Sequence, residues 1–183
     1  LFRVAPELIA CDMHPDYMAT RYAHERAQRE GLPLVAVQHH HAHIAAGMAE
    51  HGLPMDRRVI GVAFDGTGYG EDGAIWGGEF LLAGYSDYER AAHLRYVPLP
   101  GGDRAVREPW RMALAHLHAA ELPWDDDLAP VSFGRTRGPE ALAALLNQIE
   151  RGLNAPPTSS MGRLFDAAAA LAGVRQTVNY EAQ

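Results

Sequence analysis

Short apolar runs alternate with helix-forming segments along the first third of the chain, and this alternation constrains the fold more than any other feature. Apolar runs at residues 7–11, 34–37 and 58–64 have the length and content of buried β-strands. Helical patterns separate these runs, over residues 15–30 and 42–50, and each pattern ends at glycine and proline. A strand–helix–strand–helix–strand order predicts an α/β fold.

The remainder of the chain predicts a hairpin followed by helices. Residues 74–83 are expected to pair with the third apolar run across a glycine turn at 65–70, and residues 91–97 to form a further strand. A loop rich in acidic residues and proline is expected at 122–130. The predicted helices lie at about residues 108–120, 138–151 and 161–172. Together these segments predict an α/β fold with a mixed sheet and flanking helices.

Composition excludes several classes of protein. The 183 residues are 48% apolar, which is enough for a core in one large domain or in a piece of a larger one. The net charge is −7 and no basic stripe is visible, so we expect no nucleic-acid partner. The apolar runs are far shorter than a membrane span, so we expect no membrane insertion. The single cysteine, Cys11, excludes an internal disulfide and indicates a reducing compartment, hence a cytoplasmic location.

Four histidines lie within five residues, in the segment Gln38-His-His-His-Ala-His43. His39 and His43 are four residues apart, so on a helix they share one face and can bind one metal ion. Two imidazoles with a carboxylate suit iron, zinc or manganese. His40 and His41 point away from that face, so at least one of them is expected to contact a metal ligand or the substrate. The alternative is that the pair only caps a helix or makes its surface polar.

An aspartate and three glycines follow the third apolar run, in the segment Asp65-Gly-Thr-Gly-Tyr-Gly70. A buried strand that ends here delivers a carboxylate and a backbone that a ligand can approach closely. The segment lacks the Lys-Ser/Thr ending of a P-loop, the context of a dinucleotide site and the ligands of a calcium loop. A plain hairpin turn is the alternative. Beside the histidines, the segment predicts a phosphate-contacting hairpin of the kind found in actin-like ATPases.

Two further polar features lie in the helical part of the chain. Asp166 follows Phe165 in an alanine-rich helix that begins at a serine cap, and it has no basic residue four positions later. We interpret its carboxylate as an acceptor for ribose hydroxyls. Arg107 and Arg111 are one helical turn apart, so their guanidinium groups can bind a phosphate or a carboxylate, and a solvated helix start is the equal alternative.

Five motifs occur in a fixed order along the chain. They are Cys11-Asp-Met-His-Pro-Asp-Tyr17, Val37-Gln-His-His-His-Ala-His43, Phe64-Asp-Gly-Thr-Gly-Tyr-Gly70 with Trp76-Gly-Gly-Glu-Phe80, Pro100-Gly-Gly-Asp103 with Glu108-Pro-Trp-Arg111, and Ser160-Met-Gly-Arg-Leu-Phe-Asp166. In this order they resemble the HypF family, the carbamoyltransferases of nickel–iron hydrogenase maturation. The resemblance implies that residues 1–183 are part of a C-terminal, TsaD-like carbamoyl-transfer domain with an actin/Hsp70-like (ASKHA) fold. We expect the family's acylphosphatase-like, zinc-finger and YrdC-like domains to lie outside these residues, since the sequence opens abruptly on Leu1, like an excised segment.

The resemblance also implies an activity and its partners. The family makes carbamoyl-adenylate from carbamoyl phosphate and ATP. It then passes the carbamoyl group to the C-terminal cysteine of HypE, where the group is dehydrated to a cyanide ligand. The sequence leaves two alternatives open: a small-molecule O-carbamoyltransferase, which shares the histidine pair and the glycine segment, and a non-catalytic metal-binding or docking module.

The same resemblance implies a role for each site residue. A divalent metal, iron or zinc, would bind to His39, His43 and Asp65. The nucleotide would be contacted by Gly66, Thr67, Gly68, Tyr69 and Gly70, with its ribose at Asp166. The proton of the acceptor thiol would pass to His40 or His41. Cys11 ends a predicted buried strand, so we expect it to pack in the core and not to act as a nucleophile.

Overall fold

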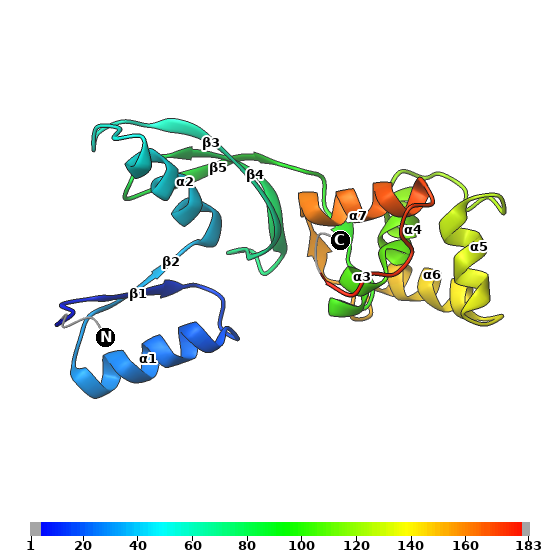
Figure 1. Ribbon diagram of the computed structural model, residues 1–183, viewed down its shortest axis with the longest axis horizontal. Helices are drawn as coiled ribbons and strands as arrows, with labels where there is room; N and C mark the ends of the chain where they lie inside the picture. Colours follow the sequence, from blue (N-terminus) through cyan, green and yellow to red (C-terminus); the bar gives the residue numbers. More distant parts are fainter. Residues whose placement is uncertain (1–4, 181–183) are drawn as a thin grey trace.

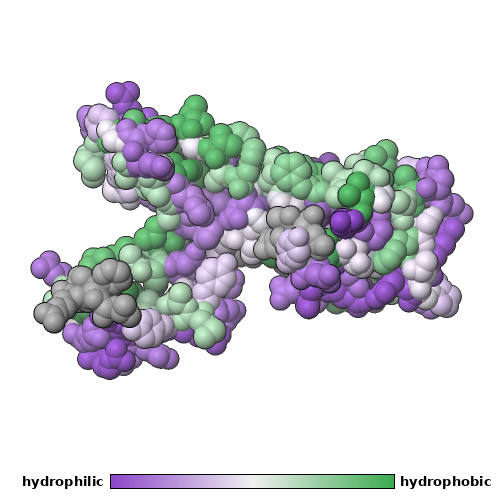
Figure 2. Space-filling view, viewed as in Figure 1, coloured by the Kyte–Doolittle hydropathy of each residue, from purple (hydrophilic) through white to green (hydrophobic). Residues whose placement is uncertain are grey.

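The computed structural model describes residues 5–180 and shows an elongated molecule with three parts (Figure 1). A small unit of two strands and a helix lies at one end, a curved sheet with one helix follows, and a group of helices forms the other end. The surface is deeply hollowed between the first part and the second (Figure 2).

Two parallel strands and one helix form the first part. β1 (Ile9–Asp12) pairs with β2 (Leu34–Val37), and α1 (Met18–Glu30) connects them, which confirms the predicted order. The helix begins three residues later than the predicted start at residue 15, because Tyr17 is its N-cap. It ends where predicted, because Gly31 adopts the left-handed conformation (φ 66°) and its N–H bonds back to the last turn.

α2 (His39–Glu50) follows β2 directly and leads to the second part. The Gln38 side chain accepts a hydrogen bond from the N–H of His41 at 2.9 Å and so caps the helix at its first histidine. The whole histidine cluster therefore lies in the first turns of a helix, so the helix begins before the predicted start at residue 42.

Antiparallel strands form the central sheet, with β4 (Ile75–Ala83) between β3 (Val59–Tyr69) and β5 (Tyr88–His93). The hairpin of β3 and β4 was predicted. The strand predicted at residues 91–97 is displaced, because most side chains of β5 are exposed and its polar sequence hides the strand pattern. Residues Val97–Pro98 form the separate two-residue strand β6.

The glycine-rich segment belongs to β3, so the turn predicted at residues 65–70 is wrong. β3 continues to Tyr69, with a shift of register between Phe64 and Gly68. The chain reverses at residues 70–74, immediately after the strand. Glycine is common both in turns and in bulged strands that approach another group closely. Here the glycines belong to a bulged strand.

Helices α3 to α7 and two short strands form the third part. The helices are α3 (Asp103–Arg107), α4 (Pro109–Ala119), α5 (Ala129–Thr136), α6 (Ala141–Arg151) and α7 (Met161–Leu171). The predicted helices correspond to α4, α6 and α7. The sequence did not indicate α5, because its Pro, Ser, Gly and Thr residues are poor helix formers and the helix depends on burying Val131.

Two apolar clusters hold the helical part together, and α4 contributes to both. The first includes Val97, Leu99, Met112, Ala113, Ala167 and Ala170. The second is formed by Trp110, Leu114, Ala115, Val131, Leu145 and Ile149. β7 (Pro157–Thr158) pairs with β6 and, in parallel, with β4, so this part continues the central sheet. The mixed sheet with flanking helices confirms the predicted fold class. Within residues 5–180, no helix has the length and apolar character that crossing a bilayer requires.

Candidate metal centre

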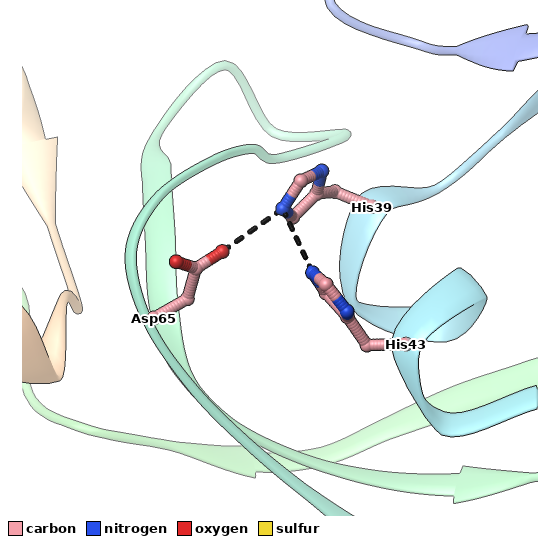
Figure 3. A group of neighbouring side chains, drawn as sticks. All are labelled: His39, His43 and Asp65. Carbon is pink, nitrogen blue, oxygen red and sulfur yellow. Dashed lines mark hydrogen bonds and ion pairs between the residues drawn. The ribbon is translucent and has the colours of Figure 1, made fainter. Parts of the chain in front are cut away.

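The structure brings His39, His43 and Asp65 together, as the sequence predicts (Figure 3). The histidines project from the first turns of α2, and the aspartate projects from β3. His39 Nε2 lies 2.9 Å from Asp65 Oδ2 and 3.2 Å from His43 Nε2. One ligand atom from each residue lies within 4.8 Å of the other two, so the three side chains converge on one point.

The two distances from His39 Nε2 are close to those between ligands of one divalent cation, and the third pair, His43 and Asp65, lies within 4.8 Å. Ligand atoms at about 2.1 Å from a common cation lie about 3.0–3.4 Å apart in octahedral or tetrahedral geometry. The donor set, two imidazole nitrogens and a carboxylate oxygen, is one that iron and zinc both accept. The side chains of His39 and Asp65 are 24% and 29% exposed, so a substrate can reach the cation from solvent. Occupation by a metal stays a prediction.

His40 is buried beneath this centre. Its side chain is 0% exposed, and its Nδ1 accepts a hydrogen bond from Gln38 Nε2. The neutral ring therefore carries its proton on Nε2, which faces Asp65 Oδ2 at 3.7 Å. Burial lowers the pKa of His40 below the usual histidine value. A Cβ at Gly68 would overlap the His40 ring, so glycine is needed where β3 crosses it.

The prediction that His40 or His41 accepts a proton from the substrate is not supported by these contacts. His40 is inaccessible, and its only basic nitrogen is already an acceptor for Gln38. His41 Nε2 donates to the carbonyl of Gly84 at 2.8 Å, and its ring packs against Tyr88. His41 lines a separate cavity of about 510 Å³. The helix turn directs the His41 side chain away from the face that carries His39 and His43.

A cavity of about 390 Å³ adjoins the metal centre on one side. Asp65, Gly66, Thr67 and Asp166 all line it, so residues predicted to contact a nucleotide do meet in space. Its remaining wall is formed by Tyr17, Gly162, Arg163 and Phe165. Asp166 Oδ2 lies 3.0 Å from Arg163 Nε, one turn earlier, so its basic partner precedes it in the sequence.

The other glycine-segment residues have different contacts, and the nucleotide role predicted for them is not supported. Gly68 packs over His40, and the Tyr69 carbonyl accepts a hydrogen bond from Gln38 Nε2. A Cβ at Gly70 would overlap the indole of Trp76. Packing beneath the strand therefore explains these positions, and the cavity accounts only for Gly66 and Thr67.

The start of α7 holds the backbone of Asp65 and Gly66 in place. Ser160 Oγ lies 2.9 Å from the carbonyl of Asp65 and 2.8 Å from that of Gly66, to which it donates. The same oxygen accepts the N–H of Arg163 and caps the helix, as the serine cap predicted. A Cβ at Gly162 would lie 2.9 Å from the Gly66 Cα, so only glycine allows the helix this close to β3.

A buried ion pair supports β4 next to this contact. Glu79 is fully buried, and its carboxylate accepts hydrogen bonds from Arg90 Nε at 2.6 Å, from Ser159 and from the N–H groups of Gly77 and Gly78. Burial raises the pKa of Glu79, but these hydrogen bonds outweigh burial and hold the pKa below its usual value. The sequence did not indicate this role, because the partners are dispersed along the chain.

The Arg111 guanidinium is engaged by protein groups, so the anion site considered for Arg107 and Arg111 is not supported. Arg111 Nε donates to Glu108 at 2.6 Å, and Arg111 Nη1 contacts the carbonyl of Pro100 and the side chain of Gln148 at 3.3 Å. Arg104 bonds to the same carboxylate. The guanidinium of Arg111 therefore stabilises the start of α4 through its hydrogen bonds to protein groups.

Cys11 lies in β1, and its thiol is not activated. Burial, with a smaller contribution from the charge of Asp12, raises the pKa of the thiol above its usual value. Cys11 is only partly buried, so the expected packing in the core is not confirmed.

Comparison with known proteins places the chain in a family. Residues 61–183 match the family model described as "Carbamoyltransferase, Kae1-like Domain, second subdomain", and residues 1–50 match the "HypF Kae1-like domain". The chain is 52% identical over its whole length to carbamoyltransferase HypF2 of Cupriavidus necator, and 49% identical to carbamoyltransferase HypF of Rhodobacter capsulatus. It spans 22% and 24% of the length of these two relatives.

Solved structures agree with the sequence matches. A crystal structure of full-length HypF in the phosphate- and nucleotide-bound form superposes with a TM-score of 0.83 at 46% identity, covering 99% of this chain and 22% of that one. The HypF structure from T. kodakarensis gives a TM-score of 0.78 at 40% identity, covering 97% of this chain and 24% of that one. The chain therefore belongs to the HypF family of carbamoyltransferases, and it matches the Kae1-like part of its members.

Proposed function

We propose that residues 1–183 form part of a C-terminal, TsaD-like carbamoyl-transfer domain and contribute its metal centre and one wall of its nucleotide site. One observation supports this proposal: Asp65 belongs both to the candidate metal centre and to the cavity proposed for the nucleotide. Its carboxylate converges with His39 and His43, and its backbone continues into Gly66 at the cavity that Asp166 lines. A cation and an adenylate bound to these residues would be neighbours.

The reaction that suits this arrangement is transfer of a carbamoyl group from carbamoyl-adenylate, made from ATP and carbamoyl phosphate, to the C-terminal cysteine of HypE. The acceptor enters as a thiolate, and its sulfur forms a bond to the carbamoyl carbon. The bond from that carbon to the phosphate oxygen breaks, and AMP leaves. A divalent iron or zinc ion would supply Lewis acidity to the carbamoyl oxygen. We propose a cytoplasmic setting for this chemistry, since the single cysteine is free.

The chain's own residues bind and orient the reactants in this scheme. His39, His43 and Asp65 hold the cation, and Asp166 accepts hydrogen bonds from the ribose hydroxyls. Gly66 brings backbone close to the phosphate, because its missing side chain leaves room. On the other side of the centre, His43 and Asp65 line a second cavity of about 530 Å³ between α2 and β3. The acceptor cysteine has a route to the cation through this cavity.

The two histidines provide the direct test. His39→Ala and His43→Ala, each in the full-length protein, should lower bound zinc or iron and carbamoyl transfer in parallel, with transfer falling by about a hundredfold or more. His24→Ala is the matched control, because it removes an exposed imidazole from α1. Metal analysis and a HypE carbamoylation assay measure the two quantities. Unchanged metal content in both variants would overturn the metal centre.

Two rival functions predict different results in the same protein. A small-molecule O-carbamoyltransferase would carbamoylate an alcohol and leave the HypE cysteine unmodified. A docking module would bind metal and show no increase in melting temperature with ATP. The matches to HypF proteins extend over the whole of this chain and favour the HypE reaction over both.

A further inference from the structure

Asp12 contacts the metal centre from a different sheet. It ends β1 in the two-stranded sheet, whereas Asp65 belongs to the central sheet. Asp12 Oδ2 lies 2.7 Å from His39 Nδ1, across 27 positions of sequence. The opposite nitrogen of the same ring, Nε2, lies 2.9 Å from Asp65. The His39 ring is therefore held between two carboxylates, one at each nitrogen.

The Asp12 carboxylate is itself firmly positioned. Its Oδ1 accepts the N–H of His14 at 2.7 Å, and its main-chain carbonyl accepts the hydroxyl of Thr20 at 3.1 Å. Its side chain is largely buried. With Oδ1 engaged in the loop, Oδ2 remains directed at His39.

We propose that Asp12 is a positioning residue that prepares His39 to bind the cation. A carboxylate accepts a hydrogen bond but cannot donate one, so Asp12 keeps a proton on Nδ1 and leaves the Nε2 lone pair for the metal. The contact also sets the ring plane, which aims Nε2 at the point where His43 and Asp65 converge. This inference rests on the proposed metal centre.

Asp12→Asn separates this role from a purely structural one. The asparagine has one amide oxygen where the aspartate has two carboxylate oxygens. That oxygen can take the position that accepts a hydrogen bond from His14 or the position that accepts one from His39, but not both. If the oxygen stays with His14, the amide N–H₂ faces His39 Nδ1 and favours the tautomer that carries its proton on Nε2. In the full-length protein, we expect zinc affinity to fall by about 10- to 100-fold, measured by competition with a chromophoric chelator. The visible absorption of the cobalt-substituted protein should also change, because the orientation of a ligand changes.

Thr20→Val is the matched control. It removes the other hydrogen bond that anchors this loop, at a buried position, without altering the carboxylate. Zinc affinity should stay within about threefold of the wild type. The proposal fails if Asp12→Asn binds zinc as wild type does, or if Thr20→Val lowers the affinity equally. Failure of the wild-type protein itself to bind zinc, iron or cobalt would instead overturn the metal centre on which the proposal rests.

Discussion

The helical part of the molecule and the metal centre are held by different forces. In the helical part, residues such as Trp110, Leu114 and Leu145 are buried together in apolar clusters. At the metal centre, single polar contacts set the geometry, as between Asp12 and His39. Apolar burial is non-directional and roughly proportional to the area removed from water, whereas a hydrogen bond depends on direction and distance. Changes in the helical part should therefore alter stability, and changes at the centre should alter function.

The largest expected effect is that of Asp65→Asn. In the full-length protein it should lower carbamoyl transfer by about a thousandfold, because a neutral amide binds a cation more weakly than a carboxylate does. The melting temperature in chelator should stay close to that of the wild type, since Asn is nearly isosteric. The rise in melting temperature that added metal gives the wild type should disappear.

Asp56→Asn is the control for this change, because it removes the same charge from an exposed loop. It should keep both the metal response and the transfer rate. If Asp65→Asn also keeps the metal response and the transfer rate, Asp65 is not a metal ligand, and the contrast between the two regions disappears.

Leu114→Ala should show the opposite pattern. The side chain is 0% exposed, so truncation leaves a cavity and should cost about 3 kcal/mol of stability. Metal bound per folded molecule should stay unchanged. Leu153→Ala makes the same truncation at a position in the helical part that is 56% exposed, and should cost less than about 1 kcal/mol. Thermal or chemical denaturation measures the difference, and equal losses for the two variants would contradict the assigned core.

Ser160→Ala should give the smallest effect and should change both stability and metal affinity. Its hydroxyl caps α7 and also contacts the backbone of Asp65. Loss of the cap should cost about 1 kcal/mol. Zinc affinity should fall by about threefold as the Asp65 backbone loses its support. Ser160→Thr keeps the hydroxyl and should restore both quantities.

Ser132→Ala is the control, because its hydroxyl lies in the helical part and donates to the loop carbonyl of Asp126. It should leave zinc affinity unchanged. A Ser160→Ala variant that loses stability but keeps full affinity would show that the helical part does not position the centre.

Local pattern was enough to predict much of the scaffold and the shared helix face of His39 and His43. Gly31 and the serine at the start of α7 act through residues within one turn, so their roles are readable from the chain. His39 and His43 share a face because the helix repeats every 3.6 residues, whatever surrounds it. The turn predicted at the glycine segment was wrong, because glycine occurs both in turns and at points of close packing. The His40 ring beneath Gly68 shows that close packing applies here.

The sequence by itself determined the order of strands and helices, the pairing of His39 with His43 and the family to which the motifs belong. These properties depend on residues that are neighbours in the chain. The tertiary structure alone decided that Asp12 also reaches the centre, since it arrives on a strand of a different sheet from that of Asp65. It also decided that His41 lies outside the centre and that Ser160 supports it. Such contacts depend on strand register and on the packing of α7 against β3, and no local spacing in the chain encodes them.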